Sequence, residues 1–133
     1  MKELSAGMVV YNPRIKKFLV LEYDSHWGFV KGGIEKGEDE KETAERELKE
    51  ETGIDKFEFV DFKEEITYYY KKEGETMFKK VVFFLITTDV KEVKLSNEHK
   101  SYKWCDYKGA YNLAKFKNTR KILEEAKIMV ESI

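Results

Sequence analysis

The stretch from Gly32 to Ile54 constrains the fold of this chain more than any other part of the sequence. Asp39 is a good helix N-cap, and a glutamate three residues later can complete a capping box. Gly53 stands where a helix commonly ends on a left-handed residue. Between them, Ala44 and Leu48 lie four residues apart and form a narrow apolar stripe. The sequence therefore predicts a helix of about a dozen residues, an ordinary length, that packs one narrow face against a sheet.

The same stretch is strongly acidic. Nine acidic and four basic side chains lie between Glu35 and Glu51. Glu47, Glu50 and Glu51 are spaced to share one helix face, where like charges repel by about a few tenths of a kcal/mol per pair. A cation bound between them would remove this repulsion. Carboxylates without histidine or cysteine partners suit hard cations such as Mg²⁺ or Mn²⁺.

Outside this stretch, strands are expected on both sides of the helix and further helices at the end of the chain. Runs rich in β-branched and aromatic residues predict strands at 4–11, 18–23, 27–31, 57–62, 66–70, 77–88, 92–95 and 101–105. Gly32-Gly33 is expected to end the extended piece before it, and Gly74 marks a turn. Apolar residues at helical spacing predict helices at 107–114 and 118–132. This order predicts an α+β fold in a single domain over residues 1–133.

The bulk composition narrows the function classes. Hydrophobic residues make up 41% of the chain, as in globular proteins, and the net charge is only −1. No overall field therefore recruits nucleic acid or a membrane. The single cysteine, Cys105, excludes an internal disulfide and a cysteine-based zinc site. With no signal peptide or transmembrane segment apparent in the sequence, the protein is expected to be cytoplasmic.

The spacing in the acidic stretch resembles a known motif. Gly32 is followed after five residues by Glu38, and after seven more by Arg46-Glu47-Leu48-x-Glu50-Glu51-x-Gly53-Ile54. This pattern resembles the Nudix box at nine positions within 23 residues, including the order of its charged groups. The resemblance implies an α/β/α sandwich around a mixed sheet, in which the box forms a loop, a helix and a loop, and a second helix lies near the C-terminus.

The resemblance also implies roles for the residues of the box. Glu47, Glu50 and Glu51 match the glutamates that bind Mg²⁺ and supply the general base, and which of them is the base stays unassigned. Glu38 and Arg46 match the pair that braces the loop against the helix. Gly32 matches a position whose backbone carbonyl faces the metal. The other glutamates of the helix and Glu35 are expected to be solvated surface residues.

Three stretches outside the box resemble the asymmetrical diadenosine tetraphosphate hydrolases of the animal and archaeal type. They are His26-Trp27-Gly28-Phe29-Val30-Lys31-Gly32, the segment from Leu95 to Trp104, and Leu113-Ala114-Lys115-Phe116. Val30 departs from this pattern, because the family usually has proline there, and the loop before Lys31 is expected to be less rigid.

By position, this second resemblance implies a set of substrate-binding residues. His26, Lys31 and Lys79 would face the phosphate chain, Tyr68 and Phe116 would stack on adenine, and Glu98 would reach the metal from a loop. Ordinary packing or solvent exposure remains an open alternative for Tyr68, Lys79, Glu98 and Phe116. One of Lys79 and Lys80 must point away from the site if both lie in a strand.

The expected function is therefore a Mg²⁺-dependent pyrophosphohydrolase, with Mn²⁺ as a possible substitute, that cleaves diadenosine tetraphosphate to ATP and AMP. The expected partner is a small nucleotide, bound by a monomer, with no stable nucleic-acid partner. The alternatives are a Nudix hydrolase that acts on RNA 5′-triphosphate or cap ends or on damaged nucleoside triphosphates, and a Nudix module that binds a nucleotide without cleaving it.

Overall fold

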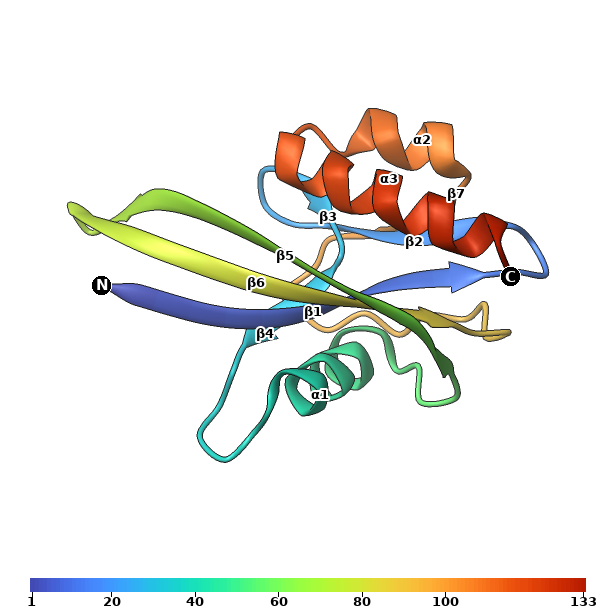
Figure 1. Ribbon diagram of the computed structural model, residues 1–133, viewed down its shortest axis with the longest axis horizontal. Helices are drawn as coiled ribbons and strands as arrows, with labels where there is room; N and C mark the ends of the chain where they lie inside the picture. The colour runs from blue at the N-terminus through green and yellow to red at the C-terminus, as the bar shows by residue number, and fades with distance from the viewer.

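The structure is a computed structural model that describes residues 1–133, and it has three layers (Figure 1). A mixed sheet of seven strands lies between the helix α1 on one side and the helices α2 and α3 on the other. The elements are, in chain order, β1 (Lys2–Asn12), β2 (Lys17–Glu22), β3 (Trp27–Gly28), β4 (Val30–Gly33), α1 (Glu40–Thr52), β5 (Glu58–Lys72), β6 (Glu75–Thr87), β7 (Tyr102–Cys105), α2 (Tyr107–Leu113) and α3 (Lys117–Glu131). This is the α/β/α sandwich that the sequence predicts.

The strand β1 is the centre of the sheet. It pairs in parallel with β6 along most of its length, and the remaining strand pairs are antiparallel. On its other side, β1 pairs with β4 over Ser5–Met8 and with β2 only at Tyr11–Asn12. The sheet therefore divides between β4 and β2, and β4 has no second partner. The candidate site lies at this division.

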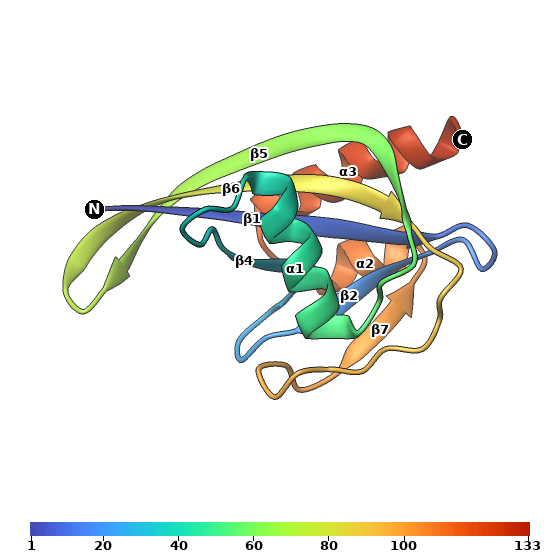
Figure 2. The ribbon, with the colours of Figure 1, turned by 90° about the horizontal axis from the view of Figure 1, so that it is seen from below.

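Each face of the sheet has its own apolar core. One core contains Val9, Val81 and Phe83 of the sheet together with Ile122 and Leu123 of α3. The other contains strand residues of the opposite face together with the narrow stripe of α1, Ala44 and Leu48, both fully buried. Figure 2 shows α1 crossing the sheet on this second face. Burying a leucine-sized side chain stabilises the fold by about 2 kcal/mol, so the stripe holds α1 to the sheet while its acidic face remains available.

The ends of α1 are as the sequence predicts. The Asp39 side chain accepts from the backbone N–H of Glu42 at 2.7 Å, and the Glu42 side chain accepts from the backbone N–H of Asp39 at 3.0 Å. Gly53 ends the helix in the left-handed region, with φ of 75°. Both predictions are confirmed.

Three details of the predicted strands are wrong. Residues 57–62 and 66–70 belong mostly to one strand, β5, whose alternation is broken by an irregular register between Val60 and Lys63. Residues 92–95 form no strand. Val93 and Leu95 are apolar because they pack, as loop residues, against the core beneath α1. The extended piece expected at 27–31 is divided into β3 and β4, and β4 includes both glycines and ends at Gly33. None of the three helices has the length and hydrophobicity needed to cross a membrane.

Val30 also differs from expectation. It lies in β4 opposite Met8, only 1% exposed, and contributes to the core on the α1 side. A β-branched residue suits a buried strand position. Lys31 is thus presented by a paired strand and not by a loosened loop.

Candidate active site

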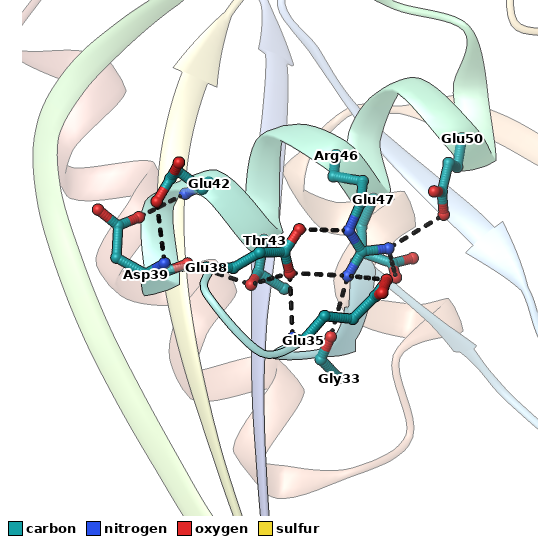
Figure 3. A network of polar contacts seen from close by, with 9 residues as sticks. All are labelled: Gly33, Glu35, Glu38, Asp39, Glu42, Thr43, Arg46, Glu47 and Glu50. Atoms are coloured by element: carbon teal, nitrogen blue, oxygen red, sulfur yellow. Dashed lines mark hydrogen bonds and ion pairs between the residues drawn. The ribbon is translucent and has the colours of Figure 1, made fainter.

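Arg46 ties the loop before α1 to the helix itself (Figure 3). Its Nε donates to Glu38 Oε2 at 2.6 Å, and its Nη2 donates to the backbone carbonyl of Gly33 at 3.0 Å. Nη2 also lies 3.3 Å from a carboxylate oxygen of Glu35, a residue expected to be only solvated surface. The hydrogen bonds from Arg46 hold the pKa of Glu38 at about 2, well below its ordinary value.

The remaining guanidinium nitrogen of Arg46 reaches two of the predicted metal-binding residues. Nη1 donates to Glu47 Oε1 at 2.9 Å and to Glu50 Oε2 at 3.2 Å. Arg46 therefore offsets the repulsion between these carboxylates and leaves one oxygen on each without a contact to it. Gly32 lies directly beneath Glu47, because a Cβ built on Gly32 would lie 2.1 Å from the Glu47 carboxyl group. Only glycine allows this close approach.

Glu51 is the most deeply buried member of the acidic face, with 2% of its surface exposed. Its Oε1 contacts the Nε2 of His99, and its Oε2 has no hydrogen-bond partner. Burial, followed by the neighbouring Glu47, raises the pKa of Glu51 to about 9. A buried oxygen without a partner is costly in a folded protein unless a ligand takes it up.

Glu47, Glu50 and Glu51 form one wall of a cavity of about 270 Å³. The opposite wall is formed by Ser96, Asn97 and Glu98, from the loop between β6 and β7. A larger cavity of about 500 Å³ runs along α1 beside Glu42, Glu45 and Phe57, and none of the predicted metal-binding residues lines it. The smaller cavity is therefore the candidate site.

The residues around this cavity fit a divalent cation. The possible metal ligands are carboxylates, which suit Mg²⁺. One of their oxygens, Oε2 of Glu51, is buried and has no hydrogen-bond partner. No three acidic or histidine side chains converge on one point as they stand. Glu50 and Glu98 are exposed, so their side chains are free to rotate toward an ion.

Lys31 and Lys79 lie on the other face of the sheet, toward α3. Lys79 pairs with Tyr68 across β5 and β6, and its neighbour Lys80 lies on the α1 face, where it contacts Glu65 at 3.2 Å. Lys31 pairs with Gly7, which in turn pairs with the core residue Phe83, so Lys31 shares the face of Lys79. Burial, together with the charge of Lys79, lowers the pKa of Lys31 to about 8. Lys31 lies near enough to be influenced both by the charge of Lys79 and by Glu51, beyond the open edge of β4.

Aromatic rings extend the site beyond the lysines. His26 stacks on Tyr23 with centroids 4.9 Å apart, and its other side meets the ring of Phe116 at 5.1 Å. Phe116 stands just before α3 and is 54% exposed, so a ligand could cover much of its ring. Tyr68 is only partly buried against the core on this face. The structure thus brings His26 and Phe116 together, with Tyr68 beside Lys79.

Sequence reasoning missed two residues that the structure brings to the site. Tyr23 lies at the end of a predicted strand and reads as a packing residue. His99 lies in the segment from Leu95 to Trp104, next to Glu98, but its contact with Glu51 spans 48 positions. The only available signal was a histidine adjacent to a predicted metal ligand.

The fold and these side chains define the class of protein. The NUDIX domain family matches residues 1–126, and the chain belongs to this family of hydrolases, whose members generally use divalent metals. The resemblance of the acidic stretch to the Nudix box is thereby confirmed at the level of the family.

Particular members of the family are similar to this chain over most of its length. The asymmetrical bis(5′-nucleosyl)-tetraphosphatase of Mus musculus is 34% identical over 119 residues, covering 82% of this chain and 77% of that protein. An RNA pyrophosphohydrolase of Nitratiruptor sp. is 35% identical over 106 residues, covering 74% of this chain and 68% of that protein. The crystal structure of a C. elegans Ap4A hydrolase binary complex superposes with a TM-score of 0.81 at 29% identity, covering 98% of this chain and 99% of that one.

Proposed function

We propose that this protein is a Mg²⁺-dependent hydrolase that cleaves diadenosine tetraphosphate asymmetrically, giving ATP and AMP. The observation that carries the proposal is the proximity of Lys31 both to Glu51, which lines the carboxylate cavity, and to Lys79. Aromatic contacts lead on from the cavity, because Tyr23 meets both His99 and His26, and His26 meets the exposed ring of Phe116. A substrate with a chain of four phosphates and a terminal purine needs these three kinds of contact together.

Glu47, Glu50, Glu51 and Glu98 would hold the ion, with the carbonyl of Gly32 beneath them. When bound, Mg²⁺ neutralises phosphate charge and lowers the pKa of a water molecule. The protein's own contributions follow from its geometry. Arg46 and Glu38 keep the acidic face and its loop in register. Lys31 and Lys79 offset the negative charge of phosphates that the ion does not contact. They also offset negative charge that develops on the phosphate chain during transfer.

The aromatic part of the site would bind the base. Phe116, with its exposed ring, offers a stacking surface, and Tyr68 is close to the phosphate-binding Lys79. Stacking of a base on an aromatic side chain contributes about 1–3 kcal/mol. His26 lies between the two functions, because its ring contacts Phe116 while burial and the charge of Lys31 lower its pKa. The proposed active form is a monomer.

The similarity to an RNA pyrophosphohydrolase supports a second candidate, the hydrolysis of RNA 5′-triphosphate ends. Such a substrate would use the same carboxylates and lysines. It would differ in continuing beyond the first nucleoside, with no second adenosine at the other end of the phosphate chain.

A hydrolysis panel distinguishes these functions. Purified protein with Mg²⁺ is incubated with diadenosine tetraphosphate, diadenosine triphosphate, 8-oxo-dGTP, ADP-ribose and 5′-triphosphorylated RNA, and products are separated by chromatography. We expect the highest kcat/KM for diadenosine tetraphosphate, with ATP and AMP in equal amounts. Two molecules of ADP, or faster release of pyrophosphate from RNA, would contradict the proposal.

Two controls accompany the panel. The Glu51→Gln variant, purified in the same way, reports any contaminating hydrolase. A reaction in ¹⁸O-labelled water identifies the phosphorus attacked, because the label enters AMP or ATP according to which side of the broken bond water joins.

A further inference from the structure

His99 contacts Glu51, although neither His99 nor Tyr23 is among the predicted site residues. We propose that His99 and Tyr23 are positioning residues that hold Glu51 so that a single carboxylate oxygen, Oε2, faces the cation cavity. This inference rests on the metal site of the proposed function and adds to it the reason why Glu51 differs from Glu47 and Glu50.

His99 and Glu51 are buried together. The side chains of His99 and Glu51 are 1% and 3% exposed, and Nε2 of His99 contacts Oε1 of Glu51. Oε2 is the only oxygen of this carboxylate without a partner, and the cavity is lined by Glu51. A carboxylate free to rotate would exchange its two oxygens. With Oε1 engaged in a closed interior, Oε2 alone is left for an ion or its water.

The ring of His99 is restrained by Tyr23. The ring of Tyr23 meets the ring of His99 edge to face, with centroids 4.6 Å apart and planes at 86°. The Tyr23 hydroxyl donates to the backbone carbonyl of Phe29 at 2.5 Å, which prevents the tyrosine ring from swinging away. The Nδ1 of His99 has no hydrogen-bond partner, so the ring is oriented by packing on one side and Glu51 on the other.

Backbone hydrogen bonds hold the loop that carries His99. Lys100 N donates to the carbonyl of Glu22 at 3.2 Å, and Glu22 N donates to the carbonyl of Ser101 at 2.9 Å. The Ser101 hydroxyl also donates to the Glu22 side chain at 2.9 Å. These bonds fasten the residues after His99 to the end of β2, immediately before Tyr23. The two positioning residues are thus held by one set of backbone contacts.

The Tyr23 ring has a second neighbour of functional interest. His26 stacks on it with an angle of 3° between the planes. One ring therefore supports both the histidine proposed to face phosphate and the histidine that orients Glu51. Loss of the whole ring should affect both, whereas loss of the hydroxyl should affect mainly the restraint on the ring.

The test compares three replacements of His99. The side-chain amide nitrogen of His99→Gln can reach the position of Nε2, that of His99→Asn falls nearer the position of Nδ1, and His99→Leu has no polar atom. Mn²⁺ affinity is measured without nucleotide from the electron paramagnetic resonance signal of free Mn²⁺. The kcat and KM for the best substrate of the panel are measured in parallel, and thermal unfolding reports the folded fraction.

We expect His99→Leu to weaken Mn²⁺ binding and to lower kcat by about 10- to 100-fold, the usual effect of losing a residue that orients a metal ligand. KM for the nucleotide should change little. His99→Gln should restore a large part of both values and His99→Asn much less. Tyr23→Phe should produce a smaller loss in the same direction, and Tyr23→Leu should in addition raise KM through His26.

Asn12→Ala is the matched control. Asn12 is also a buried polar residue, 1% exposed, and accepts a hydrogen bond from Arg14 N in the turn after β1, and it lines neither of the two cavities. It should lower thermal stability without changing Mn²⁺ affinity or kcat. Equal Mn²⁺ affinities and kcat values for His99→Gln and His99→Asn, both folded, would overturn the proposal. So would a His99→Leu protein indistinguishable from Asn12→Ala. Because Mn²⁺ binding is measured without substrate, a wrong substrate assignment would not disturb this result.

Discussion

Glu51 shows how a single residue combines a structural cost with a chemical use. A carboxylate buried beside other carboxylates is disfavoured in its charged form, which is why its pKa rises to about 9. A cation in the cavity would reverse this preference, because an adjacent positive charge favours the carboxylate. The proposed metal site therefore accounts for a carboxyl group buried at this position.

Replacement of Glu51 by glutamine should abolish most activity while the fold survives. The amide keeps the volume and removes the charge that would contact the ion, so we expect kcat to fall by about 10²-fold or more. Unfolding by heat should occur at a similar or higher temperature, because the amide removes the cost of burying an ionisable carboxyl group whose pKa is raised on folding. The matched control is Glu45→Gln, an exposed position on α1, which should leave kcat unchanged. Near-normal turnover of Glu51→Gln would refute the metal-site assignment.

The aromatic residues make a second prediction at this scale. Phe116→Ala and Tyr68→Ala should raise KM for dinucleotides by roughly 5- to 100-fold, corresponding to the loss of one stacked base, with little change in kcat. Tyr69→Ala serves as the control, because Tyr69 is 72% exposed and alternation along β5 directs it to the other face of the sheet. Steady-state kinetics separate kcat from KM. If KM stays the same in both variants, neither ring stacks on the base.

At the scale of elements, α1 is joined to its preceding loop chiefly through Arg46. The guanidinium contacts Glu35, Glu38 and the carbonyl of Gly33 on the loop side, and Glu47 and Glu50 on the helix side. The Thr43 hydroxyl adds a hydrogen bond to Glu38 at 2.8 Å. This network positions the acidic face relative to β4, which carries Gly32.

The loop-to-helix network should make stability depend on acid. The pKa of Glu38 is about 2 in the folded protein and near 4.5 when unfolded. Its contribution is therefore fully present above pH 4.5 and is lost as the pH falls toward 2. We expect Glu38→Gln to lose less stability than the natural protein between these pH values, as measured by urea unfolding. Other titrating groups are common to both proteins and cancel in the comparison. Parallel pH curves would show that Glu38 carries no such linkage.

At the scale of the whole molecule, the sheet separates two sets of functional residues. The glutamates project from α1 on one face, while Lys31, Lys79 and Tyr68 lie on the opposite face. In the proposed function, the two sets meet one substrate where the sheet divides between β2 and β4. A phosphate chain that passes this division can contact both.

Lys79 and Lys80 test this division directly. Lys79→Ala should raise KM for a polyphosphate substrate by about 10-fold or more, since a charge-assisted hydrogen bond contributes roughly 1.5–3 kcal/mol. Lys80→Ala should leave KM near its natural value, because Lys80 contacts Glu65 on the face of α1. The two substitutions remove the same charge from adjacent positions, so composition cannot explain a difference. Equal effects would show that the face of the sheet does not decide which lysine meets phosphate.

The sequence by itself determined α1, its capping box, its end at Gly53 and the membership of the family. These features are local, since they depend on spacings within 23 residues and on hydrogen bonds between neighbours in the chain. Strand positions were also largely predictable, except where the irregular register of β5 interrupts the alternation and where apolar loop residues imitate a strand.

Only the tertiary structure decided which of two adjacent lysines shares a face with Tyr68, and that His99 and Tyr23 belong to the site. The contact of His99 with Glu51 spans 48 positions, and the face of Lys79 follows from its register against both β1 and β5. Local patterns carry no information on such pairings, because a shift of one residue in register exchanges the two faces of a strand. The residue types needed for the chemistry are therefore predictable from local sequence patterns, whereas the positions of their side chains depend on long-range packing.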